Sequence, residues 1–246
     1  MGYKVSIVIP VHNEEQNIPL LYQTLKHHTE EICSSYEIIF IDDGSTDNTG
    51  NILEKLQKSN KNVSFFRMNK RSGQTNALVK GFALAKNEFI ITMDADMEHN
   101  PCYIKKFLQK IDEGYDAVIG WRKEREPKRL YRMVSSYLGN RIVNFLFHAN
   151  FKDVASPFRV FKKNLIEGEK IYNGYHRFLP LIFKGDVKIY EFPIKLEKRR
   201  YGKSRYNFLK IFECIISIVF LLFFDKEYKK ESNKNFNPRK ILKLGL

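Results

Sequence analysis

The sequence predicts an α/β fold in which helices flank a mostly parallel β-sheet. Short apolar runs alternate with longer, helix-like segments four times before residue 94, as expected of a doubly wound sheet. The runs are apolar at almost every position, which is typical of parallel strands covered on both faces. With 246 residues, 43% of them hydrophobic, the chain is long enough to bury such a sheet within one main domain.

The first predicted strand covers residues 4–10, and an amphipathic helix is predicted at 17–28. The helix is indicated by apolar residues at helical spacing, namely Ile18, Leu21, Tyr22 and Leu25. A polar, acidic loop, residues 10–15, lies between the two elements. It lacks the Gly-x-Gly-x-x-Gly pattern, which excludes the dinucleotide-binding fingerprint of a dehydrogenase.

The second predicted strand, 36–41, ends on Asp42 and Asp43. Gly44 permits a tight turn there, and Thr46 or Asp47 is expected to cap a helix that runs to residue 57. Asp42 or Asp43 is then left to face a ligand. Three further elements continue the alternation: a strand at 63–67, a glycine-containing loop at 70–76 and a helix at 77–85.

The fourth predicted strand, 89–93, stops abruptly at Asp94-Ala95-Asp96. Open α/β sheets bind ligands at the carboxyl ends of their strands, and two carboxylates one residue apart can close on one Mg²⁺ or Mn²⁺ that takes its other ligands from substrate phosphates. A solvated acidic turn is the alternative, because aspartate is common in turns. The acidic pair after strand 36–41 favours the metal.

The formal net charge of +14 indicates an anionic partner. Basic residues concentrate in segments 122–141 and 195–205. No zinc-finger, heptad or RNA-binding signature accompanies them, so nucleic acid is not the expected partner. The three cysteines are widely spaced, which favours a reducing compartment. No secretory leader precedes the first strand, so we expect the active face to be cytoplasmic.

Three regions are expected: a catalytic domain at 1–210, an apolar helix at 211–230 and a basic polar tail at 231–246. The apolar core of the second region, 211–224, is interrupted by Glu213 and is shorter than the roughly 20 residues that a spanning helix needs. Lysines flank it on both sides, which favours an interfacial or re-entrant helix seated on anionic lipid. A core helix packed on the sheet is the alternative.

Three motifs together resemble inverting family-2 glycosyltransferases with a GT-A fold. They are Ile9-Pro10-Val11-His12-Asn13-Glu14, Asp42-Asp43-Gly44-Ser45-Thr46-Asp47 and Asp94-Ala95-Asp96. Three later stretches are similar to the dolichol-phosphate mannosyltransferase branch, which transfers sugars to polyprenyl phosphates: His176-Arg177-Phe178-Leu179-Pro180, Glu191-Phe192-Pro193-Ile194 and Arg199-Arg200-Tyr201-Gly202-Lys203-Ser204-Arg205-Tyr206. The resemblance covers roughly residues 3 to 210 and implies a nucleotide-sugar donor, a Mg²⁺ or Mn²⁺ cofactor and a membrane surface as partners.

The resemblance also implies roles for individual residues. The nucleoside would be lined by Pro10, His12, Glu14, Ile41 and Asp43. Asp94, Ala95 and Asp96 would meet the diphosphate and the metal, with Glu98 as a further metal ligand. Arg122 would contact the donor phosphate or sugar, and Arg199 and Arg205, which match a basic pair of the family, would hold donor or acceptor phosphate. A solvated basic loop is the alternative for the last two arginines.

The sequence departs from the family pattern at two of these places. Arg205 stands where lysine is usual, so a planar guanidinium group replaces a compact ammonium group. Pro157 interrupts the acceptor-side stretch, residues 153–159, at a position where a small or acidic residue is expected. The Gln-x-x-Arg-Trp motif of polysaccharide-synthesising relatives is missing, which argues against a processive polymerase.

Three functions are compatible with these observations. A lipid phosphate acceptor is already mostly a dianion at neutral pH and needs no strong general base. A saccharide or protein hydroxyl would require a well-placed base, and the sequence offers no clear one. A catalytically silent, basic membrane-binding protein is disfavoured by the intact Asp43, Asp94 and Asp96. We therefore expect transfer of a hexose from GDP-mannose or a UDP-sugar to a polyprenyl phosphate.

Overall fold

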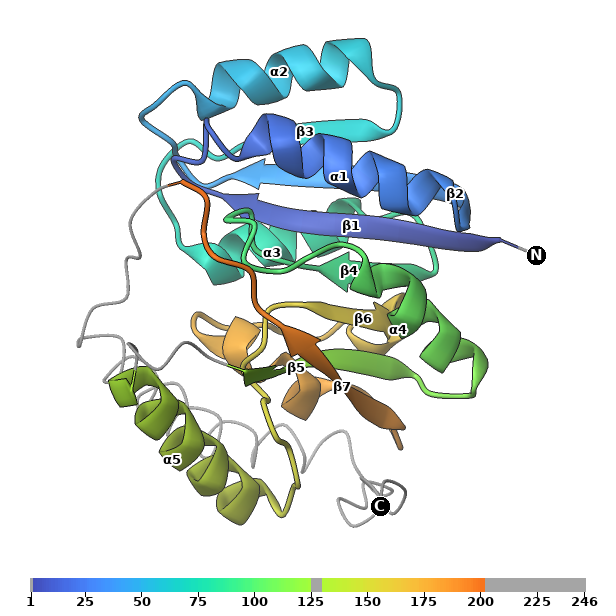
Figure 1. The fold of residues 1–246 in the computed structure, drawn as a ribbon, viewed down its shortest axis with the longest axis vertical. Helices are drawn as coiled ribbons and strands as arrows, with labels where there is room; N and C mark the ends of the chain where they lie inside the picture. Colours follow the sequence, from blue (N-terminus) through green and yellow to red (C-terminus); the bar gives the residue numbers. More distant parts are fainter. Residues whose placement is uncertain (1, 125–129, 202–246) are drawn as a thin grey trace.

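A computed structural model describes residues 2–124 and 130–201 of the chain. Its centre is a seven-stranded sheet with the order β3-β2-β1-β4-β6-β5-β7 (Figure 1). Neighbouring strands are parallel except where β6 pairs with β4 on one side and with β5 on the other. The predicted α/β class with a mostly parallel sheet is therefore confirmed, and one antiparallel strand is inserted near its middle.

The elements alternate along the chain as the apolar runs predict. The strands are β1 (Tyr3–Val11), β2 (Cys33–Asp42), β3 (Val63–Arg67), β4 (Phe89–Thr92), β5 (Ala117–Glu124), β6 (Arg159–Lys162) and β7 (Ile189–Lys195). The α-helices are α1 (Ile18–Glu30), α2 (Thr49–Ser59), α3 (Gln74–Leu84), α4 (Tyr103–Asp112) and α5 (Leu130–Phe147). Two 3₁₀ segments, η2 (Lys163–Leu165) and η3 (Tyr175–Ile182), connect β6 to β7.

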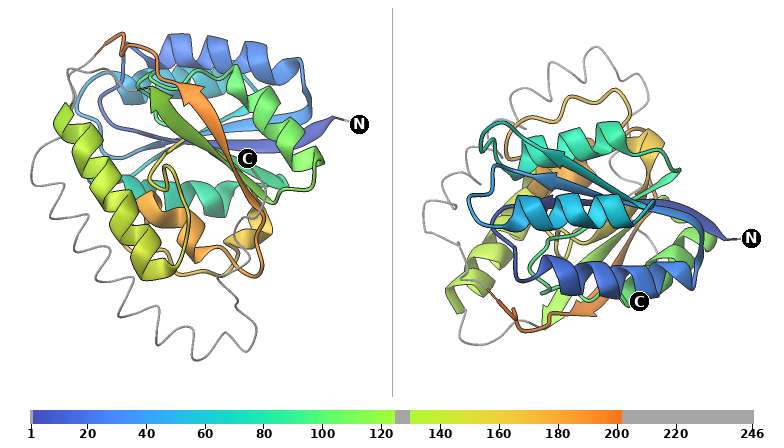
Figure 2. Two further views of the ribbon diagram at one scale, coloured as in Figure 1. Left: turned by 60° about the horizontal axis from the view of Figure 1, so that its bottom comes forward. Right: turned by 90° about the horizontal axis from the view of Figure 1, so that it is seen from above.

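Helices cover both faces of the sheet (Figures 1 and 2). On one face, residues of α1, α2 and α4 form a hydrophobic core with β1 and β2. On the other face, α3 and η3 pack with alternate residues of the same strands. The approach of α3 is close, because a Cβ added to Gly81 would lie 2.2 Å from Val8 Cγ1. The sandwich keeps the carboxyl ends of β1, β2 and β4 in fixed relation.

Two predicted boundaries differ from the structure. Helix α3 begins at Gln74, three residues before the predicted start, because Gly73 takes φ +90° and ends the preceding loop. Helix α2 begins at Thr49 with Asn48 as its N-cap residue, so neither predicted cap, Thr46 or Asp47, occupies the cap position, although Asp47 Oδ1 accepts the N–H of Thr49 at 3.0 Å. The first change matters for the site, because it places residues predicted as loop in the first turn of a helix.

The predicted membrane-interface helix, the basic tail and the predicted phosphate ligand Arg205 all lie outside the described residues. Within the part of the chain that is described, none of the helices combines the length and the apolarity needed to span a bilayer.

Candidate active site

The acidic motifs meet at one edge of the sheet. Strand β1 lies between β2 and β4 and is parallel to both. The loops that leave the carboxyl ends of these three strands are therefore neighbours, and they carry the predicted site residues from 10–14, 41–43 and 94–98. This is the edge at which open α/β sheets bind ligands.

Asp42 and Asp43 both hold the backbone of this edge together. Asp42 is fully buried, accepts the N–H of Ser45 at 2.8 Å and pairs with Arg67 at 3.4 Å. Asp43 is 5% exposed and accepts the N–H groups of Ser72 at 2.6 Å and Gly73 at 2.9 Å. A carboxylate has about four acceptor sites, so Asp43 retains capacity for a ligand. Its predicted contact with a nucleoside remains a prediction.

The first loop is tied to the second by reciprocal hydrogen bonds. Asn13, in the left-handed region at φ +57°, accepts the N–H of Thr46 at 2.8 Å. Its own N–H reaches Ser45 Oγ at 2.9 Å, and the N–H of Glu14 reaches Thr49 Oγ1 at 2.9 Å. The side chains of Pro10, His12 and Glu14 are partly exposed along this edge. By contrast, the side chain of Ile41 is fully buried in the core, because both faces of β2 are covered.

The Asp94–Glu98 loop supplies the carboxylates predicted to bind the metal. Asp94 is partly buried, and its Oδ1 accepts a hydrogen bond from Gln74 Nε2 at 2.8 Å. Burial, followed by the nearby Asp96 carboxylate, raises the pKa of Asp94 to about 7. Asp96 Oδ1 accepts the N–H of Glu98 at 3.1 Å across Met97, which takes φ +62°. Non-glycine residues in the left-handed region cost energy and cluster at functional sites.

Arg199 lies against this acidic loop. Its guanidinium donates to Asp96 Oδ2, and its Nε is 3.5 Å from Glu98 Oε1. The backbone also joins the two segments, since the N–H of Glu197 donates to the carbonyl of Glu98 at 2.9 Å. The segment after β7 therefore brings a cation to the predicted metal ligands, although 103 residues separate Arg199 from Asp96.

The carboxylates fit a divalent cation that shares its coordination with a substrate. Among residues 2–124 and 130–201, no three His, Cys, Asp or Glu side chains converge into a complete metal cage. Mg²⁺ in particular is commonly held by one or two carboxylates together with substrate phosphates. Asp94 and Asp96 lie in the loop after β4, where the sequence predicts this role. Both Asp96 and Glu98 pair with Arg199, and the metal-ligand roles of Asp94, Asp96 and Glu98 remain predictions.

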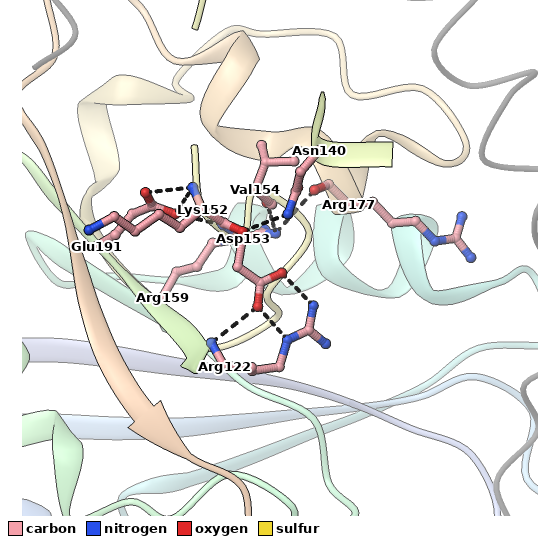
Figure 3. A network of polar contacts seen from close by, with 8 residues as sticks. All are labelled: Arg122, Asn140, Lys152, Asp153, Val154, Arg159, Arg177 and Glu191. Atoms are coloured by element: carbon pink, nitrogen blue, oxygen red, sulfur yellow. Dashed lines mark hydrogen bonds and ion pairs between the residues drawn. The ribbon is translucent and has the colours of Figure 1, made fainter. Parts of the chain in front are cut away.

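Arg122 on β5 forms a bidentate ion pair with Asp153 (Figure 3). Its Nε is 2.6 Å from Asp153 Oδ2, and its Nη2 is 2.7 Å from Oδ1. Asp153 is 1% exposed at its side chain. Glu191 of β7 holds the loop in turn, because it accepts the N–H groups of Lys152 and Asp153 at 2.8 Å. The predicted phosphate ligand Arg122 is thus fixed in orientation by two acids.

Several residues of the site were not identified from the sequence. Gln74, His99 and Arg159 lie within or next to the predicted motifs, but their roles depend on partners distant in sequence. His99 is 2% exposed, and burial lowers its pKa to about 4. No local pattern indicates such contacts, because they arise only when separate loops meet at the sheet edge.

Comparison with known proteins decides the family. The family described as "Glycosyl transferase family 2" matches residues 6–168, which is about two thirds of the chain and includes all three acidic loops. The chain belongs to glycosyl transferase family 2. The predicted family and GT-A fold are therefore confirmed. The finer assignment to a polyprenyl-phosphate branch rests on the three later stretches, all of which lie outside the matched residues.

Solved structures share the fold of this family-2 glycosyltransferase at low sequence identity. One is glucosyl-3-phosphoglycerate synthase from Mycobacterium tuberculosis in complex with Mn²⁺ and UDP-glucose, with 16% identity and a TM-score of 0.66 over 89% of this chain and 77% of that one. Another is mannosyl-3-phosphoglycerate synthase from Rubrobacter xylanophilus, with 13% identity and a TM-score of 0.65 over 96% and 77% of the two chains. At these identities, the likeness establishes the fold.

Proposed function

We propose that this protein is a metal-dependent, inverting glycosyltransferase that moves a hexose from a nucleotide sugar to a polyprenyl phosphate at the cytoplasmic face of a membrane. The donor is GDP-mannose or a UDP-sugar. The observation that carries the proposal is the contact of Arg199 with Asp96 and Glu98, in the loop that also carries Asp94, at the carboxyl edge of the sheet. Acidic residues from the loop after β4 and a basic residue from the segment after β7 meet there.

The acidic half of the site suits the donor. Mg²⁺ or Mn²⁺ held by Asp94 and Asp96 would neutralise the nucleoside diphosphate as it leaves the sugar. The solved structure of similar fold that contains Mn²⁺ and UDP-glucose supports this assignment. Arg199 pairs with Asp96 and lies 3.5 Å from Glu98, so it is close enough to meet a phosphate that binds beside them. The protein contributes chiefly by positioning two anions against each other and by stabilising charge.

A phosphate acceptor is favoured over a hydroxyl acceptor by the state of Asp153. A hydroxyl needs a general base within hydrogen-bond reach of its proton. Asp153 is the acid on the acceptor-side stretch, but it is buried and paired with Arg122 through two hydrogen bonds. Because both of its oxygens accept hydrogen bonds from Arg122, Asp153 is poorly available to take a proton from an acceptor hydroxyl. An acceptor that is already an anion requires no such group.

A donor and acceptor screen tests the proposal. We would incubate the purified full chain with labelled UDP-glucose or GDP-mannose, with Mn²⁺ or EDTA, and with polyprenyl phosphate, a free saccharide or 3-phosphoglyceric acid. The last compound is included because a structure of similar fold is described as a complex with phosphoglyceric acid. We expect label in the lipid fraction, dependent on Mn²⁺ or Mg²⁺ and abolished by Asp96→Asn.

Each acceptor in this screen distinguishes the proposed function from another one. Transfer to the saccharide but never to the lipid would replace the proposal by a hydroxyl-acceptor transferase. Transfer only to 3-phosphoglyceric acid would retain the phosphate acceptor and reject the membrane lipid. Full activity in excess EDTA would remove the metal from the mechanism.

A further inference from the structure

The first turn of α3 connects three parts of the site through consecutive residues. The N–H of Gly73 donates to Asp43 on the β2 side. The side-chain amide of Gln74 donates to Asp94 on the β4 side at 2.8 Å. Thr75 Oγ1 accepts the N–H of Gly174 at 2.9 Å and is 2.7 Å from His176 Nδ1. One helical turn therefore touches the loop predicted to bind the nucleoside, the metal-side loop and segment η3.

The contacts on either side hold the backbone of Gln74 in place. Gly73 takes φ +90°, a conformation that other residues adopt only with strain, and Asp43 accepts its N–H through both carboxylate oxygens. Thr75 is fully buried. The backbone at Gln74 is therefore already ordered, and the hydrogen bond to Asp94 has to offset only the ordering of the Gln74 side chain itself, about 1.5–2 kcal/mol.

We propose that Gln74 is a positioning residue that orients Asp94 for the divalent cation. The amide N–H occupies Asp94 Oδ1 and restricts rotation of the carboxylate. Groups that hydrogen-bond a metal ligand fix its orientation, and their loss typically costs about 10- to 100-fold in metal affinity or activity. Because Asp43 holds the neighbouring residue, the same turn links the region predicted to bind the nucleoside to the metal. This inference rests on the proposed function, since it requires a cation at Asp94.

The test measures Mn²⁺ binding to the full chain, without substrates, by electron paramagnetic resonance of the unbound ion. Gln74→Met keeps the length of the side chain and removes the donor. Gln74→Asn keeps an amide that is one methylene too short to reach Asp94. Asn76→Ala is the matched control, because Asn76 Nδ2 donates to the carbonyl of Ser72 from the same helical turn and is exposed.

We expect both Gln74 variants to bind Mn²⁺ about tenfold more weakly than the parent, while Asn76→Ala and the parent bind alike. The melting temperature of Gln74→Asn should be at least as high as that of Asn76→Ala. Weaker Mn²⁺ binding by Gln74→Asn would then come from the lost orientation of Asp94 and not from a loss of the fold. Equal Mn²⁺ affinities for the parent and the folded Gln74 variants would overturn the inference alone. The parent is also titrated with UDP or GDP present, because substrate phosphates supply part of the coordination of such cations. Absence of Mn²⁺ binding by the parent both with and without the nucleotide would overturn the metal of the proposed function and this inference with it.

Discussion

The guanidinium of Arg199 neutralises the carboxylates of Asp96 and Glu98, as a divalent cation bound beside them would also do. These carboxylates are 10% and 16% exposed at their side chains, so neutralising them matters more than it would at an open surface. A positive guanidinium also repels an incoming cation. Arg199 and the metal are therefore expected to compete until a substrate phosphate gives the arginine another partner.

This competition predicts that Arg199→Ala binds Mn²⁺ more tightly than the parent when nucleotide is absent. One partly exposed ion pair is worth about 1 kcal/mol, so the gain should be about fivefold. Sugar transfer should fall in the same variant. Mn²⁺ titration followed by electron paramagnetic resonance measures the first effect. Arg200→Ala is the control, because it removes the same charge from an exposed neighbour. Weaker binding by Arg199→Ala would show that the arginine supports the metal site instead.

His99 makes the stability of the protein sensitive to acid. The ring is 2% exposed and packs edge-on against Phe158, and within the described residues neither ring nitrogen has a hydrogen-bond partner. Burial lowers its pKa to about 4, and Arg122 acts in the same direction, whereas Asp96 and Asp153 oppose the shift. The imidazole is therefore neutral in the folded protein at pH 7.

The sign of the effect follows from linkage. Because the folded pKa lies below the ordinary value of 6.5, the unfolded chain binds the extra proton first. The contribution of the neutral ring is complete above pH 6.5 and is lost as the pH falls toward about 4. We predict that the free energy of unfolding falls less for His99→Leu than for the parent when the pH is lowered from 7 to 5. Urea unfolding with EDTA present measures this quantity. Parallel pH profiles for the two proteins would contradict this account.

At the scale of elements, Arg159 joins β6 to two segments that carry no strand pairing of their own. The side chain is 2% exposed. Its Nη1 donates to the carbonyl of His176 at 2.8 Å, and its Nη2 donates to the carbonyls of Val154 at 3.1 Å and Arg177 at 3.3 Å. A buried guanidinium thus replaces backbone hydrogen bonds that η3 and the 153–156 loop lack.

We predict that Arg159→Met lowers the free energy of unfolding by about 3 kcal/mol, because each carbonyl left buried without a donor costs about 1–3 kcal/mol. Amide hydrogen exchange in η3 should accelerate before exchange in β1. Arg71→Met is the control, since Arg71 is exposed. A loss below about 1 kcal/mol would mean that the segment is held by its apolar contacts alone.

The elements also show how far the sequence could predict the structure. Strands β1, β2 and β4 and their acidic ends were predictable, because apolar runs and the residues that follow them are local patterns. The antiparallel insertion of β6 was not, since a run of four residues carries no information about direction. The same limit applies within the site. Gln74 reaches Asp94, and Arg122 reaches Asp153, only after distant loops have been brought together.

Taken as a whole molecule, the chain carries a formal net charge of +14. At the site, Arg122 and Arg199 are paired with acidic residues. The sequence places much of the excess positive charge on both sides of the apolar run at 211–224. Basic residues beside an apolar segment attract anionic lipid at about 1 kcal/mol each. Under the proposed function, these residues are the ones expected to meet the membrane that holds the polyprenyl phosphate.

The last prediction tests this membrane contact with the full chain. We expect the parent to co-sediment with vesicles that contain phosphatidylglycerol, and to bind more weakly as salt screens the surface charge. Lys203→Gln combined with Lys210→Gln should weaken binding by about 30-fold, which corresponds to two lysines at about 1 kcal/mol each. Lys55→Gln combined with Lys61→Gln is the control, because both lysines are exposed in or just after α2, far in sequence from the apolar run. Equal binding by all three proteins would contradict the interfacial helix and favour its packing on the catalytic domain.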